Sequence, residues 1–348
     1  MAYGTVNADV IGTSVTGSNL GAGNASIMKN RIINGAMVID QRNAGASVTG
    51  NNGVFITDRF RVVATQTSKL TGQQNAGSVT PPVGYTNYLG ITSSSAYSVA
   101  SGDVFAITHP IEGFNIADLG WGTASAKTVT LSAWVYSSLT GTFGGSLQNG
   151  STNRAYPFSY TISSANTWTQ ISITIAGDTT GTWATNNTQG ILVSFALGAG
   201  STFSGTAGAW AAANQYSVTG ATSVVGTNGA TFYITGVQLE VGSSATGFEY
   251  RQYQQELALC QRYYQRFDGV LGEVAFMSSA YTGNSNHYSS VFLMVQMRAA
   301  PTCTTTGWNN AAGASINAAG LTVIGISMNQ TASGYFSNGV LVTASSEL

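Results

Sequence analysis

Charged residues are scarce in this chain. Lysine and arginine together number 12 and aspartate and glutamate 13 among 348 residues. The charged fraction is therefore 7 %, where an ordinary soluble domain carries roughly 25 %. A net charge of -1 leaves no basic surface that could neutralise a run of phosphates or coat an anionic membrane. We therefore expect neither nucleic acid nor a membrane as a partner.

Long apolar stretches are also missing. The longest runs, such as Val291–Val295, are far shorter than the roughly 18 residues of a membrane-spanning helix. The opening MAYGTVNADV lacks the basic start and apolar stretch of a secretory signal, which predicts a protein made in the cytoplasm. The two cysteines, Cys260 and Cys303, are too few for a disulfide framework and too far apart for a metal knuckle. We expect both to be buried free thiols.

Motifs for catalysis are equally rare. The chain has two histidines, His109 and His287, no serine in a G-x-S-x-G elbow, and no phosphate-binding glycine motif ahead of a helix. His109 lies beside a probable strand end and is predicted to be structural. The sequence therefore predicts no catalytic residue, no cofactor and no metal site.

Glycoside hydrolysis needs only two carboxylates, so acidic residues keep that alternative open. The candidates are Asp40, Asp58, Asp103, Glu112, Asp118, Asp178, Glu240 and Glu249. Their spacing does not pair them, and structural roles compete: Asp58-Arg59 and Glu240 are typical of strand-end ion pairs or turn anchors. A calcium site that uses Asp58 or Glu240 also stays open, although no loop of acidic ligands supports it.

What the chain does have is an alternation of apolar and other residues with a period of two. In one run, Val129, Leu131, Ala133 and Val135 alternate with Thr128, Thr130, Ser132, Trp134 and Tyr136. This is the pattern of a strand with one face in a core. Similar runs recur up to Val241, separated by clusters of glycine, asparagine and aspartate that favour tight turns. Many short strands must hide their edges, so we predict a mainly β protein with a jelly-roll β-sandwich over residues 30–245.

Three further segments flank the sandwich. Residues 1–29 have too few apolar residues to fold alone and are predicted to be an arm that orders against a partner. Residues 246–269 are predicted to form a helical neck that begins with a capping box at Thr246 and Glu249. Its apolar seam, spaced by three and four residues, consists of Tyr250, Tyr253, Leu257, Cys260, Tyr264 and Phe267. The seam fits either one amphipathic helix packed on a sheet or a helix shared between identical chains. Residues 270–348 are predicted to form a small C-terminal β tip domain.

Aromatic residues stand in several polar, turn-rich stretches. An indole there offers a flat apolar face and one N–H donor, which suits a sugar ring. The predicted carbohydrate contacts are Trp121, Tyr156, Trp168, Trp183 and Trp210. The alternative is that these rings simply cap the core.

Four stretches of the sequence resemble a known family. They are NRIINGAMVIDQRNAG at 30–45, TDRF at 57–60, the stretch 111–143 that begins IEGFNIADLGWG, and FYITGVQLEVGSSATGFEYRQYQQELALCQRYYQR at 232–266. Together they resemble tail-fibre and related virion proteins of tailed bacteriophages, over about residues 30–301. The resemblance implies a carbohydrate-binding-module-like jelly roll, a homotrimer, and a C-terminal β tip presented to the host. It implies no catalytic residues.

We therefore predict a virion fibre subunit of a phage tail, which is not an enzyme. Its N-terminal arm would dock to other virion proteins, its seam would join three identical chains, and it would attach to host cell-surface glycan. The predicted location is the virion. Two alternatives stay open: a capsid fibre or head decoration protein without a receptor role, and a depolymerase of capsular polysaccharide.

Overall fold

The computed structural model describes residues 28–268, 285–306, 311–330 and 341–348. Apart from Met28 and Lys29, the predicted arm lies outside the described residues. In the described part of the chain, no helix has the length and apolar character of a membrane span.

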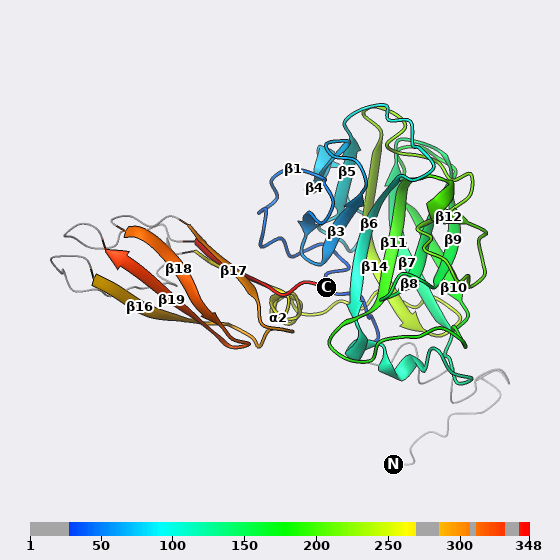
Figure 1. Cartoon of the computed structure of the whole chain (residues 1–348). Coiled ribbons are helices and arrows are strands. Elements are labelled where there is room, and N and C mark those ends of the chain that lie inside the picture. Colours follow the sequence, from blue (N-terminus) through cyan, green and yellow to red (C-terminus); the bar gives the residue numbers. More distant parts are fainter. Residues whose placement is uncertain (1–27, 269–284, 307–310, 331–340) are drawn as a thin grey trace, which may run out of the picture.

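Two antiparallel sheets of six strands each face one another (Figure 1). The first, sheet A, has the order β1 (Val48–Thr49), β4 (Leu70–Gln74), β5 (Leu89–Ser93), β14 (Thr231–Val241), β7 (Val129–Ser137) and β10 (Thr169–Ile175). The second, sheet B, has the order β2 (Phe55–Thr57), β3 (Phe60–Ala64), β6 (Val104–Glu112), β11 (Gln189–Ala199), β8 (Gly141–Asn149) and β9 (Ala155–Ile162). The predicted mainly β fold with a jelly-roll sandwich is confirmed.

The core of the sandwich follows from the two-residue period. Val129, Leu131 and Val135 of β7 are fully buried and share one cluster with residues of sheet B such as Phe195. Truncating a buried leucine to alanine costs about 2–5 kcal/mol, so each strand is held to this register. The β14–β7 pairing shifts between Thr235 and Gln238. The shift contains Gly236, whose φ of +61° and contact with the Tyr85 ring leave no room for a Cβ.

The outer faces of the two sheets differ in how far they are covered. A segment over residues 200–222, with η4 (Ser201–Phe203), β12 (Ser204–Gly205) and β13 (Ser217–Val218), crosses sheet B. Its Phe203 and Tyr216 pack against outward-facing residues of β6 and β11. On sheet A, a segment with η1 (Ala76–Ser78) covers only part of the face around Tyr233. The outer face of sheet A is therefore open along β10 and at Trp134 of β7, whereas Thr130, Ser132 and Tyr136 of β7 are buried.

The helix is shorter than predicted and starts differently. Helix α2 covers Tyr253–Gln261, and its N-cap residue makes no side-chain capping hydrogen bond. The predicted capping box is wrong, because the sandwich binds both of its side chains. Thr246 Oγ1 donates to Glu240 at 2.6 Å, and the Glu249 carboxylate accepts the Asn30 N–H at 2.7 Å.

After α2 the chain turns back to β structure, which corrects the predicted neck of 246–269. Residues Tyr264–Asp268 form β15, which pairs with β20 (Leu341–Ser345), itself paired with β17 (Thr302–Thr306). A second three-stranded sheet has the order β16 (Ser285–Phe292), β19 (Val323–Gln330) and β18 (Ala311–Ala319). These six strands form the tip, which projects from the sandwich with α2 between them (Figure 1).

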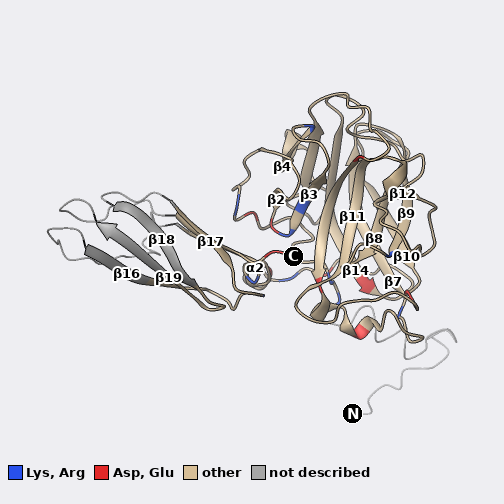
Figure 2. Cartoon of the chain, viewed as in Figure 1, with Lys and Arg blue, Asp and Glu red and all other residues tan. Residues whose placement is uncertain are grey.

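Most charged residues gather where α2 and the last residues of the chain meet the sandwich. We call this region the joint, and in Figure 2 several of the blue and red positions of the ribbon lie around α2 and the C-terminus. The segments η2 (Gly113–Asn115) and η3 (Ala117–Leu119) follow β6 at the same end of the sandwich. Arg262 pairs with Glu112 at 2.6 Å, and the Tyr263 hydroxyl donates to the same carboxylate at 2.6 Å. Buried charges are tolerated only when they are paired in this way. The joint therefore fixes α2 to the end of β6.

A second set of contacts holds the end of the chain at the joint. Arg59 is fully buried, donates to the Pro110 carbonyl at 2.6 Å, and lies 3.5 Å above the ring of Tyr263. The Glu347 carboxylate pairs with both Arg59 and Arg42. The predicted role of Asp58-Arg59 in ion pairs is thus confirmed, with the difference that Asp58 pairs with Arg42 and not with its neighbour.

His109 and the cysteines behave as structural residues. His109 is 1 % exposed and its Nε2 lies 3.0 Å from the Ile33 carbonyl oxygen. Burial holds the pKa of His109 well below its ordinary value, so the ring is neutral. Both cysteines are free thiols, as predicted, but only Cys260 is buried; Cys303 is half-buried.

Candidate functional site

Four of the five predicted aromatic residues come together at one end of the sandwich. The rings of Trp121, Trp183 and Trp210 are mutually perpendicular, with centroids 4.7–5.3 Å apart, and Tyr156 lies 5.2 Å from Trp210. Edge-to-face packing of this kind stabilises a core. Trp210 is the half-buried member of the four; the other three are less than 10 % exposed.

The indole N–H groups of this cluster are already used within the chain. Trp210 donates to the Ala176 carbonyl at 2.8 Å and Trp183 to Asp178 at 3.2 Å. Burial alone would raise the pKa of Asp178, but hydrogen bonds from Arg154, Thr180 and Trp183 lower that pKa to about 2. Only the ring face of Trp210 therefore stays available for a ligand, with its neighbours as support.

Trp168 lies in a different place, on the outer face of sheet A. Its ring centroid is 5.5 Å from that of Tyr88 and 5.4 Å from that of Tyr136. Tyr136 in turn stacks on Tyr233 with an interplanar angle of 7°. The indole N–H of Trp168 donates to the Thr80 carbonyl at 2.9 Å. The five predicted contacts therefore do not form one site.

Trp134 is the residue that the sequence prediction of contacts left out. It stands two residues before Tyr136 on β7, so its side chain shares the outer face of sheet A. The ring is half-buried, and Trp134 makes no side-chain hydrogen bond or ring contact with another described residue. The signal was present in the sequence, because Trp134 falls on the non-core side of the alternation in 128–136.

Small polar side chains surround Trp134 on the open part of the face. Gln170 of β10 lies directly opposite Trp134, and Ser172 lies opposite Ser132 in the next outward-facing row. Gln170 and Ser172 are exposed, and directly opposed residues in such a ladder have their side chains about 5 Å apart. A flat ring with a free N–H next to an amide and an exposed hydroxyl is suited to a neutral polyhydroxy ligand. We call Trp134, Gln170 and Ser172 the open face of sheet A; Ser132 beside them is buried, at 6 % exposure.

The predicted inter-chain seam is not one continuous surface. Cys260, Tyr264 and Phe267 are buried within their own chain, at 1, 9 and 2 % exposure. Tyr264 and Phe267 belong to β15 and not to a helix. Leu257 packs with Ile33, Ile39 and Tyr263 in the joint. Tyr250 and Tyr253 remain exposed, at 60 and 57 %, and stay predicted inter-chain contacts.

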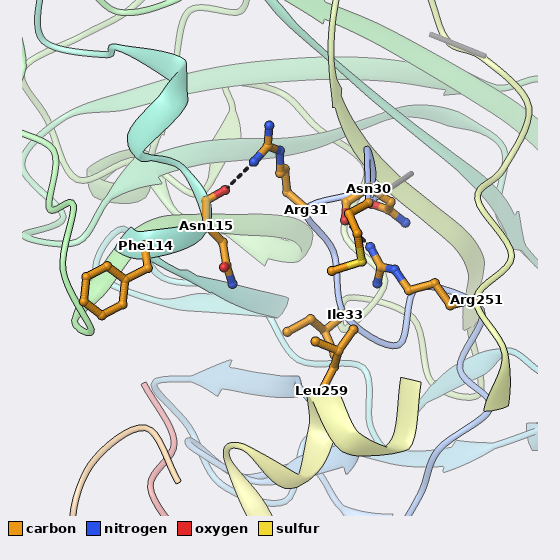
Figure 3. Close-up of a pocket in the computed structure, with 8 residues that line it drawn as sticks. Asn30, Arg31, Ile33, Phe114, Asn115, Arg251 and Leu259 are labelled. Carbon is orange, nitrogen blue, oxygen red and sulfur yellow. Dashed lines mark hydrogen bonds between the residues drawn. The ribbon is translucent and has the colours of Figure 1, made fainter. Parts of the chain in front are cut away.

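A cavity of about 220 Å³ lies between the sandwich and α2 (Figure 3). Its two arginines are engaged in structural contacts: Arg31 donates to the Asn115 carbonyl at 2.9 Å and pairs with Asp118, while Arg251 donates to the Ile32 carbonyl at 3.1 Å. The rest of the wall, including Phe114 and Leu259, is mostly apolar or amide. The cavity is part of the joint and presents no acid–base pair for catalysis.

All eight candidate carboxylates hold the fold. Asp40, for example, accepts the backbone N–H groups of Asn43 and Gly45, at 3.0 and 2.8 Å. Asp103 accepts hydrogen bonds from the side chains of Tyr97, Gln66 and Thr65. Glu240 anchors Thr246, as the turn-anchor prediction expected. The others are bound by arginines or by backbone N–H groups.

A metal site finds no support in these carboxylates. Among the described residues, no group of three histidine, cysteine, aspartate or glutamate side chains could hold a metal ion. The two residues considered for calcium have their oxygens bound elsewhere: Asp58 by Gln41 and Arg42, and Glu240 by Thr246 and Gln238.

No family model and no curated protein matches the sequence. A putative sugar binding protein from Bacteroides thetaiotaomicron is 13 % identical with a TM-score of 0.36, and the match covers 61 % of this chain and 100 % of that chain. The family 11 carbohydrate-binding module from Clostridium thermocellum, solved with a mixed-linked tetrasaccharide, is 10 % identical with a TM-score of 0.29, covering 58 % of this chain and 96 % of that chain.

A third match is the enzymatically active domain of tailspike protein 4 of bacteriophage CBA120. It is 12 % identical with a TM-score of 0.34, and the match covers 62 % of this chain but only 22 % of the tailspike chain. Because all three TM-scores are below 0.5, we argue the function from the residues of this chain.

Proposed function

We propose that this chain is a fibre subunit of a bacteriophage virion, which binds host cell-surface polysaccharide and works as a homotrimer. The observation that carries the glycan part is the open face of sheet A, where Trp134 keeps a partly exposed ring and an uncommitted indole N–H beside Gln170 and Ser172. The virion part is supported by the four resembling stretches within residues 30–301.

In this proposal Trp134 stacks on a sugar ring, and the Gln170 amide and the Ser172 hydroxyl bind sugar hydroxyls. Trp168 and Trp210 are further contacts, because their rings are partly exposed. Trp121, Tyr156 and Trp183 act by holding Trp210 in place. A single site of this size binds weakly, and three copies raise the avidity by about 10² to 10⁴ when a polymer can reach several sites.

The arm over residues 1–29 docks the subunit to other virion proteins, and the protein has no catalytic residue. Both statements are proposals. The structural roles of the eight carboxylates support the second.

The test of glycan binding compares two tryptophans of similar burial. Trp134→Ala should weaken binding to an array of bacterial capsular and O-antigen polysaccharides by about 30-fold, because truncating a central tryptophan contact costs about 2 kcal/mol and 1.4 kcal/mol is tenfold. Trp210→Ala removes a further contact that lies away from the open face and should weaken binding much less. Thermal unfolding of both variants checks that they are folded.

Three outcomes would change the proposal. Loss of binding in Trp210→Ala alone moves the site to the cluster of Trp121, Trp183 and Trp210. Absence of binding to every polysaccharide overturns the glycan part. Antibody labelling of virions that marks the head and not the tail favours the head decoration alternative, and release of reducing ends from a polysaccharide favours the depolymerase.

A further inference from the structure

The tip has apolar side chains on both faces of one sheet. Val291, Leu293 and Ile324 are buried inside the chain, at 5, 9 and 0 % exposure. Phe292 and Val323, which neighbour them on the paired strands, point the other way, and Met294 and Leu321 lie in the adjoining bends; all four are exposed. The exposed fractions of Phe292, Met294, Leu321 and Val323 are 76, 59, 40 and 36 %. We call these four residues the tip patch.

The tip patch is contiguous. Phe292 at the end of β16 lies directly opposite Val323 at the start of β19. Beyond the strands, the Leu293 N–H donates to the Thr322 carbonyl at 2.9 Å. Met294 and Leu321 lie in the adjoining bends, where the Met297 N–H donates to the Leu321 carbonyl at 2.9 Å.

Two opposed large apolar side chains on an outer sheet face, with two more exposed in the adjoining bends, call for a partner. An antiparallel sheet with one solvated face normally alternates apolar and polar residues, and the sandwich strand β10 does so, with Gln170 and Ser172 facing outwards. Contiguous exposed apolar patches mark interaction surfaces, whereas single exposed apolar residues are ordinary.

Charge identifies the kind of partner. Within residues 285–306, 311–330 and 341–348, the charged residues are Arg298 and Glu347. Both point to the joint: Arg298 donates to the Asn187 carbonyl at 2.7 Å, and Glu347 pairs with Arg42 at 3.0 Å. A charged partner would find no counter-charge around the patch. A second copy brings an equally neutral apolar surface, and copies with a net charge of -1 repel one another little.

We propose that the tip patch is the surface through which copies of this chain bind one another. The inference rests on the homotrimer of the proposed function and gives it a location. Around a threefold axis, the patch of each copy meets the same patch of its two neighbours. The neck then contributes less to assembly than the spacing of its apolar seam predicts, because Cys260, Tyr264 and Phe267 are already buried within one chain.

The experiment is sedimentation velocity of the full chain at micromolar concentration. The wild type should sediment at about three times the mass of the 35.9 kDa chain. Phe292→Ser with Met294→Ser should raise the concentration needed for assembly at least tenfold. The control, Tyr250→Ser with Tyr253→Ser, removes the two exposed neck residues that stay predicted inter-chain contacts and should weaken assembly less than the tip variant does.

Each of the other outcomes overturns a defined part of the proposal. If the control dissociates and the tip variant does not, the contact lies in the neck and this inference is wrong. If both variants assemble like the wild type, the tip patch is likewise excluded. A monomeric wild type refutes the homotrimer as well, but polysaccharide binding lost in Trp134→Ala would still establish the glycan site.

A second measurement tests the proposal in case the tip variant does not fold. A nitroxide label on Ser290→Cys, an exposed position of β16 two residues before Phe292, in a Cys303→Ser background, should show dipolar broadening between copies that disappears on dilution with unlabelled chain. A spectrum without broadening, at a concentration where the wild type is assembled, overturns the inference.

Discussion

Removing the negative charge of Glu347 should destabilise the joint. This carboxylate pairs with Arg59, whose side chain is 0 % exposed, and with Arg42, whose side chain is 14 % exposed. In Glu347→Gln the two arginines keep an oxygen acceptor but lose their shared counter-charge. Breaking a buried pair typically costs 3–5 kcal/mol, because it leaves an uncompensated buried charge.

The expected loss lies near the lower end of that range. Arg59 would retain its hydrogen bond to the Pro110 carbonyl and its contact with the Tyr263 ring, and Arg42 would retain the rings of Phe55 and Tyr264. At an effective dielectric constant of 20, two charges 4 Å apart interact by about 4 kcal/mol. We therefore expect Glu347→Gln to lower the free energy of unfolding by about 3 kcal/mol.

The assay is urea unfolding followed by tyrosine and tryptophan fluorescence. The matched control is Asp118→Asn, which makes the same chemical change at the Arg31 pair, where the carboxylate is 48 % exposed. An exposed pair contributes at most about 1 kcal/mol, so the control should lose less than that. Equal losses in the two variants, or a loss below about 0.5 kcal/mol in Glu347→Gln, would refute the reasoning.

Two predictions concern pH, with opposite signs. The pKa of Asp178, about 2 in the folded chain, is below its unfolded value of about 3.9, so its ionised form contributes about 2 kcal/mol of stability above pH 4 that is lost as pH falls toward 2. Urea unfolding between pH 2.5 and 6 should show this loss in the wild type and a flatter profile in Asp178→Asn; parallel profiles would contradict it. Burial raises the pKa of Asp58 to about 7, so stability should fall as pH rises from about 4 to 7, and Asp58→Asn should remove that fall. An identical decline in both proteins would show that another group is responsible.

The sandwich could be predicted from local pattern, because burying one strand face leaves a two-residue period in the sequence. Residues 128–136 show it, and β7 has Val129, Leu131 and Val135 in the core. The helix could be predicted only in part. Its spacing of three and four is correct up to Cys260, but Tyr264 and Phe267 pair with β20, about 80 residues further along the chain. Such a distant partner overrides local spacing and leaves no local trace.

The candidate site was predictable only to the level of residue type. The sequence indicated that aromatic residues belong to the candidate site. Which rings stay exposed, however, depends on the segments that pack over them. Trp121 and Trp183 pack on each other, although they are 62 positions apart. Trp134 stays partly exposed because the covering segment lies over sheet B and not over β7 and β10. The capping box was predicted wrongly for the same reason, because Glu249 binds Asn30, which lies 219 positions earlier in the sequence.

Because most charged residues gather at the joint, added salt should affect the joint more than the open face or the tip patch. Ser132, Trp134, Gln170 and Ser172 carry no charge, and neither do Phe292 and Val323. Added ions screen charge–charge attraction but hardly affect stacking on a ring or contact between apolar surfaces. The proposed binding of a neutral polymer to the open face should therefore vary little with ionic strength, which should act mainly on ion pairs such as those that Glu347 makes with Arg42 and Arg59 at the joint.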